Sequence, residues 1–356
     1  MIYPFIHAVT HCVNETVNHK YLYKNMKIPS CLKPHLLMSL LFTLAAPHTQ
    51  AANPVTSDTL RFHFATVEEA RQLLGANDEF TRGWSRFDIL SRLQKTNGTK
   101  AELIAYKQRE ARAWTEEEKQ IIWQDMLDLN RIIRQEGYLL PLPPEVVLVK
   151  STLADEGGAG GYTQANWIAL AESLVQKADE KGRRYLLLHE LSHILTRHSV
   201  DYKKRLYAAL GFEIAPHPLE YPQELLEKRI SNPDIAAYDS YGPFRINGRT
   251  ELCAMYLYAD RPYTGGPFFK YLQIAFVPYD EHGKAKRNAD GQLIYYGIKD
   301  IEDFSERVGK NTNYTIHPEE ILAENFVLAF LNTLNVPTPE LQQRVRKVLY
   351  RADVER

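Results

Sequence analysis

The string HELSH at residues 189–193 lies inside an apolar run from Tyr185 to Leu195 and constrains this chain more than any other feature. On a helix, the pattern HExxH places two imidazoles one turn apart on the same face, where both can bind a single zinc ion. Glu190, between His189 and His193, is then available as a general base. Leucine and isoleucine side chains surround most of this helix, and buried polar groups need compensating partners. The motif therefore predicts a metal-binding helix in the core.

A catalytic zinc site uses three protein ligands and leaves one position for water, so a third ligand is required. His198 is the nearest candidate. The metzincin pattern, however, needs a glycine where this chain has Thr196 and a histidine where it has Ser199, which excludes that class. We expect His198 to be a surface histidine near the end of the helix.

A better candidate lies far downstream, where a second apolar helix is expected to begin at Pro318. Proline suits the first turn of a helix, and the adjacent Glu319 and Glu320 suit its positive end. Glu320 and Glu324 are four residues apart, and two buried like charges on one helix face repel. Glu320 as third zinc ligand, with Glu324 accepting a hydrogen bond from a ligating histidine, would account for both carboxylates. The alternative is that all three glutamates are ordinary first-turn acids facing water.

An HExxH string followed by a later helix with the pattern E-x-x-x-D/E resembles the gluzincin group of zinc metallopeptidases. The stretch PEEILAENF at residues 318–326 is most similar to the glutamate helix of the anthrax-lethal-factor-like branch. In that branch, a tyrosine six or seven residues before the ligand glutamate helps to stabilise the transition state, and Tyr314 stands six residues before Glu320. The resemblance covers the two helices and their approaches. The 126 residues between His193 and Glu320 are a longer separation than in the compact members of the group.

The resemblance implies a helix-rich α+β chain with a zincin-like core, in which a mixed sheet accompanies the active-site helix and the glutamate helix. One Zn²⁺ per chain, held by His189, His193 and Glu320, would lower the pKa of its bound water. Glu190 would take a proton from that water as it attacks a scissile carbonyl, and Tyr314 would donate to the developing oxyanion. Two imidazoles and one carboxylate suit zinc, although cobalt or manganese would also fit.

The N-terminal part of the chain has the pattern of a secretory signal peptide. Met26 opens a basic stretch, residues 36–46 are apolar, and residues 49–51 resemble a small-residue cleavage site. The apolar stretch is too short to span a bilayer. We expect residues 1–25 to be an upstream leader or a misassigned start and 26–52 to be the signal peptide. The mature protein would then be periplasmic or secreted, with no stable membrane insertion; a retained N-terminal anchor is the alternative.

The net charge bears on which partners the protein could bind, and the cysteine content bears on whether it could form disulfides. The formal net charge of −1 over 356 residues gives no reason to expect a nucleic-acid partner. Cys12 and Cys31 fall in the segment expected to be removed, which leaves Cys253 and no disulfide within a monomer. Cys253 lies in an apolar run, so we expect a buried, unreactive side chain.

Periodicity divides the mature chain into a helical N-terminal region, residues 53–145, and a zincin-like metallopeptidase domain, residues 146–356. Residues 162–170 precede the HExxH helix and are expected to form the rim strand of a cleft, along which an extended substrate would add as another strand. The segment 200–310 is the least informative. Other elements are expected as follows: helices over 66–137 and 339–351, and strands over 146–150, 166–170, 250–280 and 291–298.

Three functions stay open at this point. The first is a zinc endopeptidase acting on peptides or proteins outside the cytoplasm, although the sequence does not separate endopeptidase from exopeptidase action. The second is a zinc hydrolase of the same architecture that acts on a non-protein amide, and the third is a non-catalytic, metal-stabilised interaction protein. Glu190 is not needed for structural zinc binding, which argues against the third, whereas nothing in the sequence separates the first two.

Overall fold

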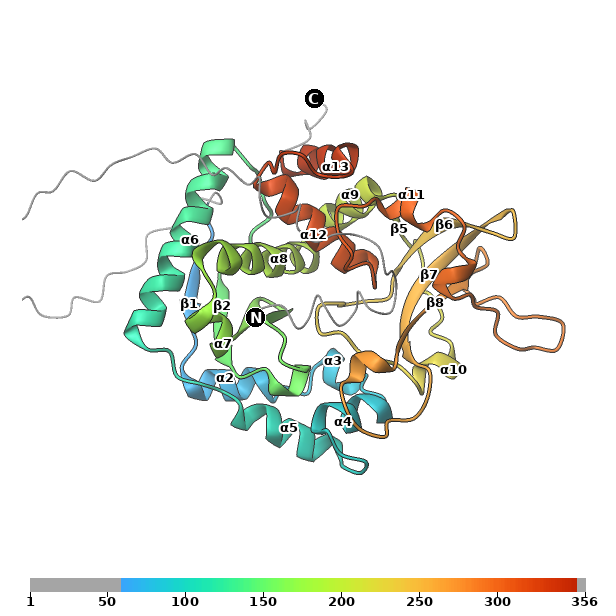
Figure 1. Cartoon of the computed structure of the whole chain (residues 1–356), viewed down its shortest axis with the longest axis horizontal. Helices are drawn as coiled ribbons and strands as arrows, with labels where there is room; N and C mark the ends of the chain where they lie inside the picture. Colours follow the sequence, from blue (N-terminus) through green and yellow to red (C-terminus); the bar gives the residue numbers. More distant parts are fainter. Residues whose placement is uncertain (1–58, 351–356) are drawn as a thin grey trace, which may run out of the picture.

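The computed structural model describes residues 59–350, and this part of the chain has an α+β fold (Figure 1). It contains two four-stranded sheets together with helices from every part of the described sequence. The expected helix-rich α+β class is confirmed. The expected leader, the signal peptide and the two N-terminal cysteines lie outside the described residues.

The first sheet is mixed and has the strand order β1-β2-β4-β3. Strands β1, β2 and β4 run parallel, and β3 pairs antiparallel with β4 at the edge. Such a sheet needs cover on both faces, and accordingly β4 is buried along its whole length. The strands are β1 (Phe62–Phe64), β2 (Val146–Ser151), β3 (Gly161–Gln164) and β4 (Trp167–Ala171).

The strands expected over 146–150 and 166–170 are present as β2 and β4. The expectation of one rim strand over 162–170 is wrong, because the chain reverses at Ala165, whose φ is 45°. The segment is therefore a hairpin, and its first strand, β3, alone lies at the sheet edge.

The second sheet is antiparallel, with the order β5-β6-β7-β8. Asn247 and Gly248 join β6 to β7 with positive φ at both positions, as a two-residue hairpin turn requires. The strand expected over 291–298 does not form; isolated bridges such as Phe276–Tyr296 replace it. A turn that Asn288 closes by accepting from the Gln292 N–H interrupts the ladder. The strands are β5 (Glu213–Ile214), β6 (Ser240–Ile246), β7 (Arg249–Ala259) and β8 (Leu272–Pro278).

Between residue 59 and β2 the structure has five helices, in line with the helical periodicity over 66–137. Four of them begin with a capping box, in which a Ser or Thr side chain and an acidic side chain three residues later satisfy each other's backbone N–H groups; these caps are Thr66, Ser85, Thr99 and Thr115. The helices are α2 (Val67–Leu74), α3 (Glu79–Arg82), α4 (Arg86–Leu93), α5 (Lys100–Arg109) and α6 (Glu116–Glu136).

Helix α8 (Glu180–His198) lies at the centre of the molecule, packed against β3 and β4 of the mixed sheet and against α12 (Pro318–Phe330) (Figure 1). A single apolar cluster joins α6, the mixed sheet, α8, α12 and α13, so the core extends across the boundary expected at residue 145. The expected C-terminal helix is present as α13. The remaining helices are α7 (Glu172–Lys177), α9 (Val200–Leu210), α10 (Gln223–Leu226), α11 (Phe304–Val308) and α13 (Pro339–Leu349), with short 3₁₀ turns η1 (Ala154–Glu156), η2 (Phe268–Lys270) and η3 (Ile298–Asp300).

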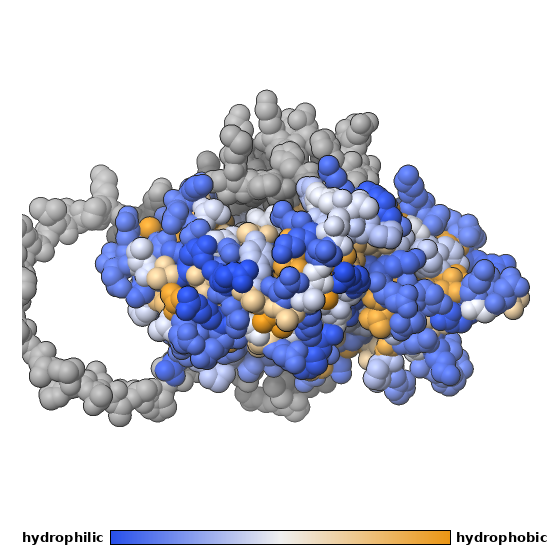
Figure 2. Space-filling model, turned by 90° about the horizontal axis from the view of Figure 1, so that it is seen from below, coloured by the Kyte–Doolittle hydropathy of each residue, from blue (hydrophilic) through white to orange (hydrophobic). Residues whose placement is uncertain are grey.

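The surface carries no broad apolar face in the view of Figure 2, where hydrophilic residues predominate and hydrophobic ones form small separate groups. Exposed large apolar side chains such as Trp123, Val200 and Leu334 are far apart in the sequence. Scattered apolar residues of this kind are normal on a protein surface. Between residues 59 and 350, none of the helices has the length and apolar character that crossing a membrane requires.

Candidate metal centre

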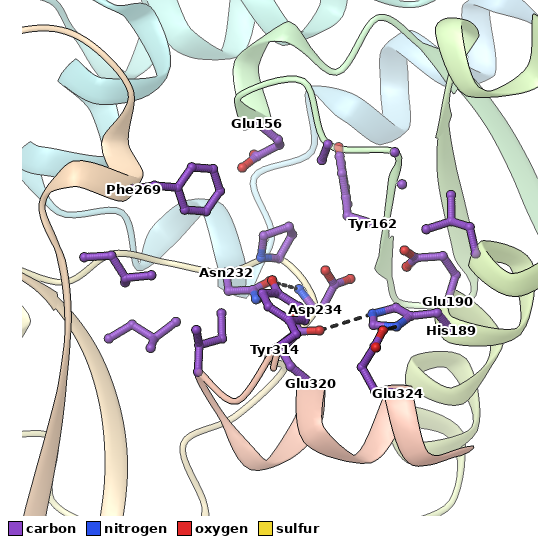
Figure 3. A pocket seen from close by; sticks show the side chains of 18 of the residues that line it. Glu156, Tyr162, His189, Glu190, Asn232, Asp234, Phe269, Tyr314, Glu320 and Glu324 are labelled. Atoms are coloured by element: carbon purple, nitrogen blue, oxygen red, sulfur yellow. Dashed lines mark hydrogen bonds and ion pairs between the residues drawn. The ribbon is translucent and has the colours of Figure 1, made fainter. Parts of the chain in front are cut away.

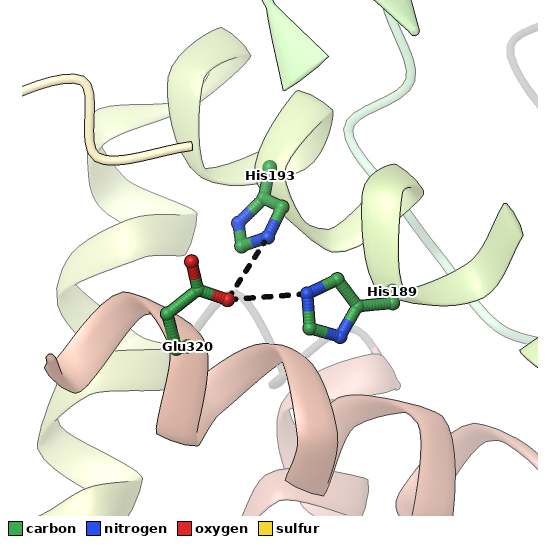
Figure 4. A group of neighbouring side chains, drawn as sticks. All are labelled: His189, His193 and Glu320. Carbon is green, nitrogen blue, oxygen red and sulfur yellow. Dashed lines mark hydrogen bonds and ion pairs between the residues drawn. The ribbon is translucent and has the colours of Figure 1, made fainter. Parts of the chain in front are cut away.

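Helices α8 and α12 bring His189, His193 and Glu320 together in the core (Figure 4). The Nε2 atoms of the two histidines lie 3.2 Å and 3.8 Å from the same carboxylate oxygen, Glu320 Oε2. One ligand atom from each residue lies within 4.8 Å of the others, and all three residues are buried. The sequence therefore predicted which residues from two distant helices meet, although 126 residues lie between them in the chain.

The other ring nitrogen of His189 faces Glu324, as the sequence predicted. His189 Nδ1 lies 3.1 Å from Glu324 Oε1, and Glu324 Oε2 accepts hydrogen bonds from Tyr185 Oη at 2.7 Å and Thr312 Oγ1 at 3.1 Å. Burial by itself lowers the pKa of His189, but hydrogen bonds to Glu320 and Glu324 outweigh it and raise that pKa well above its ordinary value. The ring is thus fixed with Nε2 directed at Glu320.

His193 has an equivalent partner that the sequence analysis missed. Its Nδ1 lies 3.0 Å from Glu319 Oε1, while Glu319 also accepts from Thr196 Oγ1 at 2.6 Å and from Tyr207 Oη at 2.5 Å. Burial alone raises the pKa of Glu319, but these hydrogen bonds and the nearby charges bring it down to about 2. The alternative in which the three glutamates face water is wrong, because Glu319 and Glu320 are buried and Glu324 is largely covered. The apolar residues that follow Glu319 and Glu320 in the sequence were the signal from which the burial of Glu319 could have been predicted.

A buried polar atom without a partner indicates what this arrangement can hold. Within the described residues, His193 Nε2 is buried and has no hydrogen-bond partner. Such an atom is costly to bury, whereas a lone pair held there by an Nδ1–carboxylate bond is the usual form of a metal-ligating histidine. His189, His193 and Glu320 therefore offer two imidazole nitrogens and one carboxylate oxygen, a donor set that suits zinc.

Glu190 of α8 faces the edge strand β3. Its Oε2 atom accepts a hydrogen bond from Thr163 Oγ1 at 2.8 Å, and its Oε1 atom lies beside Gly161. Burial raises the pKa of Glu190 above its ordinary value, and the neighbouring histidines oppose this rise. A carboxylate whose proton affinity has been raised in this way is suited to accept a proton near neutral pH.

A tight turn at residues 231–235 brings two further polar side chains to the centre, and the sequence analysis did not single it out. Asn232 Nδ2 donates a short hydrogen bond to Glu320 Oε1, the oxygen that faces away from the histidines. Asp234 Oδ1 accepts from the Thr163 backbone N–H at 2.6 Å. Burial and the nearby charges of Glu190 and Glu320 raise the pKa of Asp234 well above its ordinary value. The local signal was the string Asn232-Pro233-Asp234, which favours a turn.

A cavity of about 150 Å³ adjoins the centre (Figure 3). Glu190, Glu320 and Glu324 lie at its base, and Tyr314 borders it beside them. Burial raises the pKa of Tyr314 well above its ordinary value, with a further contribution from Glu320, so its hydroxyl is a protonated donor at neutral pH. The remaining wall is mostly apolar and includes Leu186, Ile230, Leu257, Phe268, Phe269 and Ile316.

Two other expectations concern residues outside the centre. His198 is exposed at the end of α8, as predicted. Cys253 is a buried free thiol in β7, and burial raises its pKa to about 12.

Comparison with known proteins yields no relative from which a function can be read. No protein-family model, no curated protein and no solved structure matches this chain. The chemistry of the site therefore rests on the residues described above.

Proposed function

We propose that this protein is a zinc-dependent metallopeptidase of the gluzincin type with a zincin-like core. The observation that carries the proposal is the convergence of two Nε2 atoms on one oxygen of Glu320, while each Nδ1 atom bonds to a separate carboxylate. Two like-charged glutamates buried one turn apart are otherwise unfavourable. A dication beside them removes the repulsion, which supports the metal.

Zinc held by His189, His193 and Glu320 would lower the pKa of a bound water and polarise a carbonyl oxygen. The residues around the metal would transfer the proton, stabilise the oxyanion and orient the two imidazoles. Glu190, fixed by Thr163, takes a proton from the attacking water and delivers it to the leaving amine. Tyr314, protonated and beside Glu320, donates to the oxygen that becomes negative during attack. Glu319 and Glu324 keep both imidazoles in the metal-binding tautomer.

Glu190 distinguishes this proposal from a purely structural metal site. A structural site needs donors, whereas Glu190 points into the cavity and contacts none of the three donor atoms by a hydrogen bond in the described structure. A zinc hydrolase of a non-protein amide remains the second candidate, because the same residues would serve it. The apolar wall of the cavity and the free edge of β3 favour a peptide, since both suit an extended chain with side chains. Secretion or a periplasmic location belongs to the same proposal.

Metal analysis of the purified protein with two variants tests the proposal. We expect one zinc per chain in the parent and in Glu190→Gln, which should lose hydrolysis of a peptide library because it lacks the base. Glu320→Ala should lose most of its zinc. Glu302→Gln, an exposed substitution, is the control and should match the parent. If Glu320→Ala binds zinc as tightly as the parent, Glu320 is not a ligand; if Glu190→Gln hydrolyses peptides normally, the mechanism is wrong.

A further inference from the structure

The turn at residues 231–235 forms a wall across one end of the metal centre. Arg197 of α8 donates to the backbone oxygens of Pro233 and Asp234 at 2.7 Å and 2.8 Å. From the other side, Asn232 bonds to Glu320 of α12 and Asp234 bonds to β3. The turn thus joins the three elements that line a substrate cleft in the proposed function.

Buried charges from the N-terminal helices hold this wall in place. Asp88 accepts hydrogen bonds from the Ser231 backbone N–H at 2.8 Å and from the Ser231 hydroxyl at 2.7 Å. Arg92 donates to the backbone carbonyl oxygen of Ser231 at 2.6 Å. Arg92 is itself paired with Asp88 and Glu156. Because these groups are almost completely buried, moving the turn would leave several charges without partners. The wall is therefore a fixed part of the site and not a lid.

The wall itself borders the cavity, which is lined by Ser231, Asn232, Pro233 and Asp234. On α8 the cavity contacts Gly182, Tyr185, Leu186, His189 and Glu190, whereas the wall is held by Arg197, two turns further along the helix. Asp234 of the wall occupies the Thr163 N–H at the free edge of β3. A peptide that pairs with this edge therefore cannot continue along β3 past Thr163.

Strand β3 determines which end of a bound peptide meets the wall. Gly161, at its start, lines the cavity, and the Thr163 N–H, further along, points to the free edge and bonds to Asp234. A peptide that adds antiparallel to β3, the more stable pairing, runs in the opposite direction. Its amino end therefore faces Thr163 and Asp234, while its carboxyl-terminal part runs past Gly161 toward the cavity.

We propose that the protein recognises the free amino end of its substrate and acts as an aminopeptidase, with the Asp234 carboxylate binding the α-ammonium group. This inference rests on the proposed peptidase function. Asp234 is 8 % exposed and faces Glu190 and His193, with one ligand atom of each within 4.8 Å of the others. A charge-assisted hydrogen bond from an ammonium group would compensate the burial of this carboxylate.

The bond that is hydrolysed follows the first residue of the peptide. Water adds across this amide, so the products are one free amino acid and a peptide shortened by that residue. The second residue then lies beside Gly160 and Gly161, where Leu174 and Leu186 of the cavity lining favour an apolar side chain. The substrate class is therefore a peptide with a free amino end and an apolar second residue.

A matched pair of peptides tests this inference with the full protein. The first is Ala-Leu-Ala-Ala-Ala-amide and the second is the same peptide with an acetylated amino end. We expect release of alanine from the first, and a value of kcat/KM that is about 10- to 100-fold lower or unmeasurable for the second, since a hydrogen bond to a charged group is worth about 1.5–3 kcal/mol. Cleavage of the acetylated peptide at the same rate, or cleavage of internal bonds only, would overturn the inference.

Two variants connect the preference to Asp234. Asp234→Asn keeps an oxygen for the Thr163 N–H but removes the charge, so we expect it to retain zinc and to lose about 10- to 100-fold in kcat/KM for the free peptide. The ratio of its kcat/KM values for the free and the acetylated peptide should approach one. Asp239→Asn is the control, because Asp239 pairs with Lys203 and does not border the cavity. An undiminished preference for the free peptide in Asp234→Asn would assign the recognition to another residue.

A binding measurement separates failure of this inference from failure of the peptidase proposal. Calorimetry with zinc-loaded Glu190→Gln should give tighter binding of the free peptide than of the acetylated one, and Asp234→Asn in that background should abolish the difference. Equal binding of both peptides overturns amino-end recognition. Selective binding of the free peptide without any hydrolysis by the parent would support amino-end recognition and would refute the peptidase.

Discussion

Nδ1 of His193 lies 3.0 Å from Oε1 of Glu319, the residue immediately before the Glu320 whose carboxylate faces Nε2 of the same ring. Two consecutive glutamates of one helix thus contact opposite ends of one imidazole. Glu319 can do so because it lies in the first turn of α12, beside the helix N-cap His317, whose Nδ1 accepts from the Glu319 N–H. The start of α12 therefore supplies both a candidate ligand and the group that orients its partner.

Glu319→Gln should weaken zinc binding by about 10- to 100-fold, the usual loss when the hydrogen-bond partner of a ligating histidine is changed. The amide keeps the size of the side chain but no longer fixes the His193 tautomer by charge. Competition against a chromophoric chelator measures the affinity. Tyr207→Phe removes a different hydrogen bond to the same carboxylate and serves as the control, with a smaller loss expected. Unchanged affinity in Glu319→Gln would mean that Glu319 has no part in metal binding.

Tyr314→Phe should lower kcat by about 10²- to 10³-fold, the range observed when one donor to a developing oxyanion is removed. Because the hydroxyl is needed in the transition state, KM and zinc content should change little. Steady-state kinetics on the preferred peptide, together with metal analysis, separate these quantities. Tyr296→Phe provides the comparison, because Tyr296 pairs with Phe276 of β8 and does not border the cavity. A Tyr314→Phe enzyme with parental kcat would remove this residue from the mechanism.

Zinc should stabilise the folded protein, because His189, His193 and Glu320 meet only when α8 and α12 are packed together. Free zinc at 100 times its dissociation constant contributes about 2.7 kcal/mol to the free energy of unfolding. For a folded chain of this size, the thermal midpoint should rise by roughly 3 to 5 °C relative to protein treated with EDTA. Thermal denaturation followed by circular dichroism measures the shift. Glu320→Ala should show almost none; a shift equal to that of the parent would place the metal elsewhere.

The parts of this site that sequence predicts are those whose signal is local. The HExxH spacing and the Pro-Glu-Glu start of α12 each lie within a few residues, and each fixes which side chains share a helix face. The wall at residues 231–235 could not be predicted in this way. Asp234 reaches Thr163 across 71 positions, and Ser231 reaches Asp88 across 143, so neither contact leaves a periodic pattern.

The fold shows the same division between local and long-range information. Capping at Thr115 and the apolar periodicity that follows it predicted α6. The reversal at Ala165 could not be predicted, because this position holds no glycine and Asn166 is the only turn-forming residue beside it. The sequence pattern therefore indicated one strand where the structure has a hairpin. The strand expected over 291–298 does not form because the turn closed by Asn288 interrupts the ladder and leaves only isolated bridges such as Phe276–Tyr296.

Arg92 should contribute strongly to stability, since it carries a buried charge paired with Asp88 and Glu156. Arg92→Met keeps most of the side-chain volume but leaves two buried carboxylates with fewer partners, so we expect a loss of about 3–5 kcal/mol in the free energy of unfolding. Urea denaturation measures this loss. Lys119→Met removes an exposed partner of Glu116 and should cost less than about 1 kcal/mol. Equal effects of the two substitutions would show that the buried network does not hold the turn at Ser231.

Cys253 should resist alkylation in the folded protein. Burial raises the pKa of its thiol to about 12, so at pH 8 only about one molecule in 10⁴ carries the reactive thiolate, against roughly a quarter in the unfolded chain with its ordinary pKa near 8.5. The native state therefore binds more protons than the unfolded state above about pH 8.5, and stability should fall as the pH rises through that range. Iodoacetamide labelling at pH 8, with the modified peptide identified by mass spectrometry, should mark Cys253 in urea but not in buffer. Rapid labelling in buffer would contradict the buried position of this residue in β7.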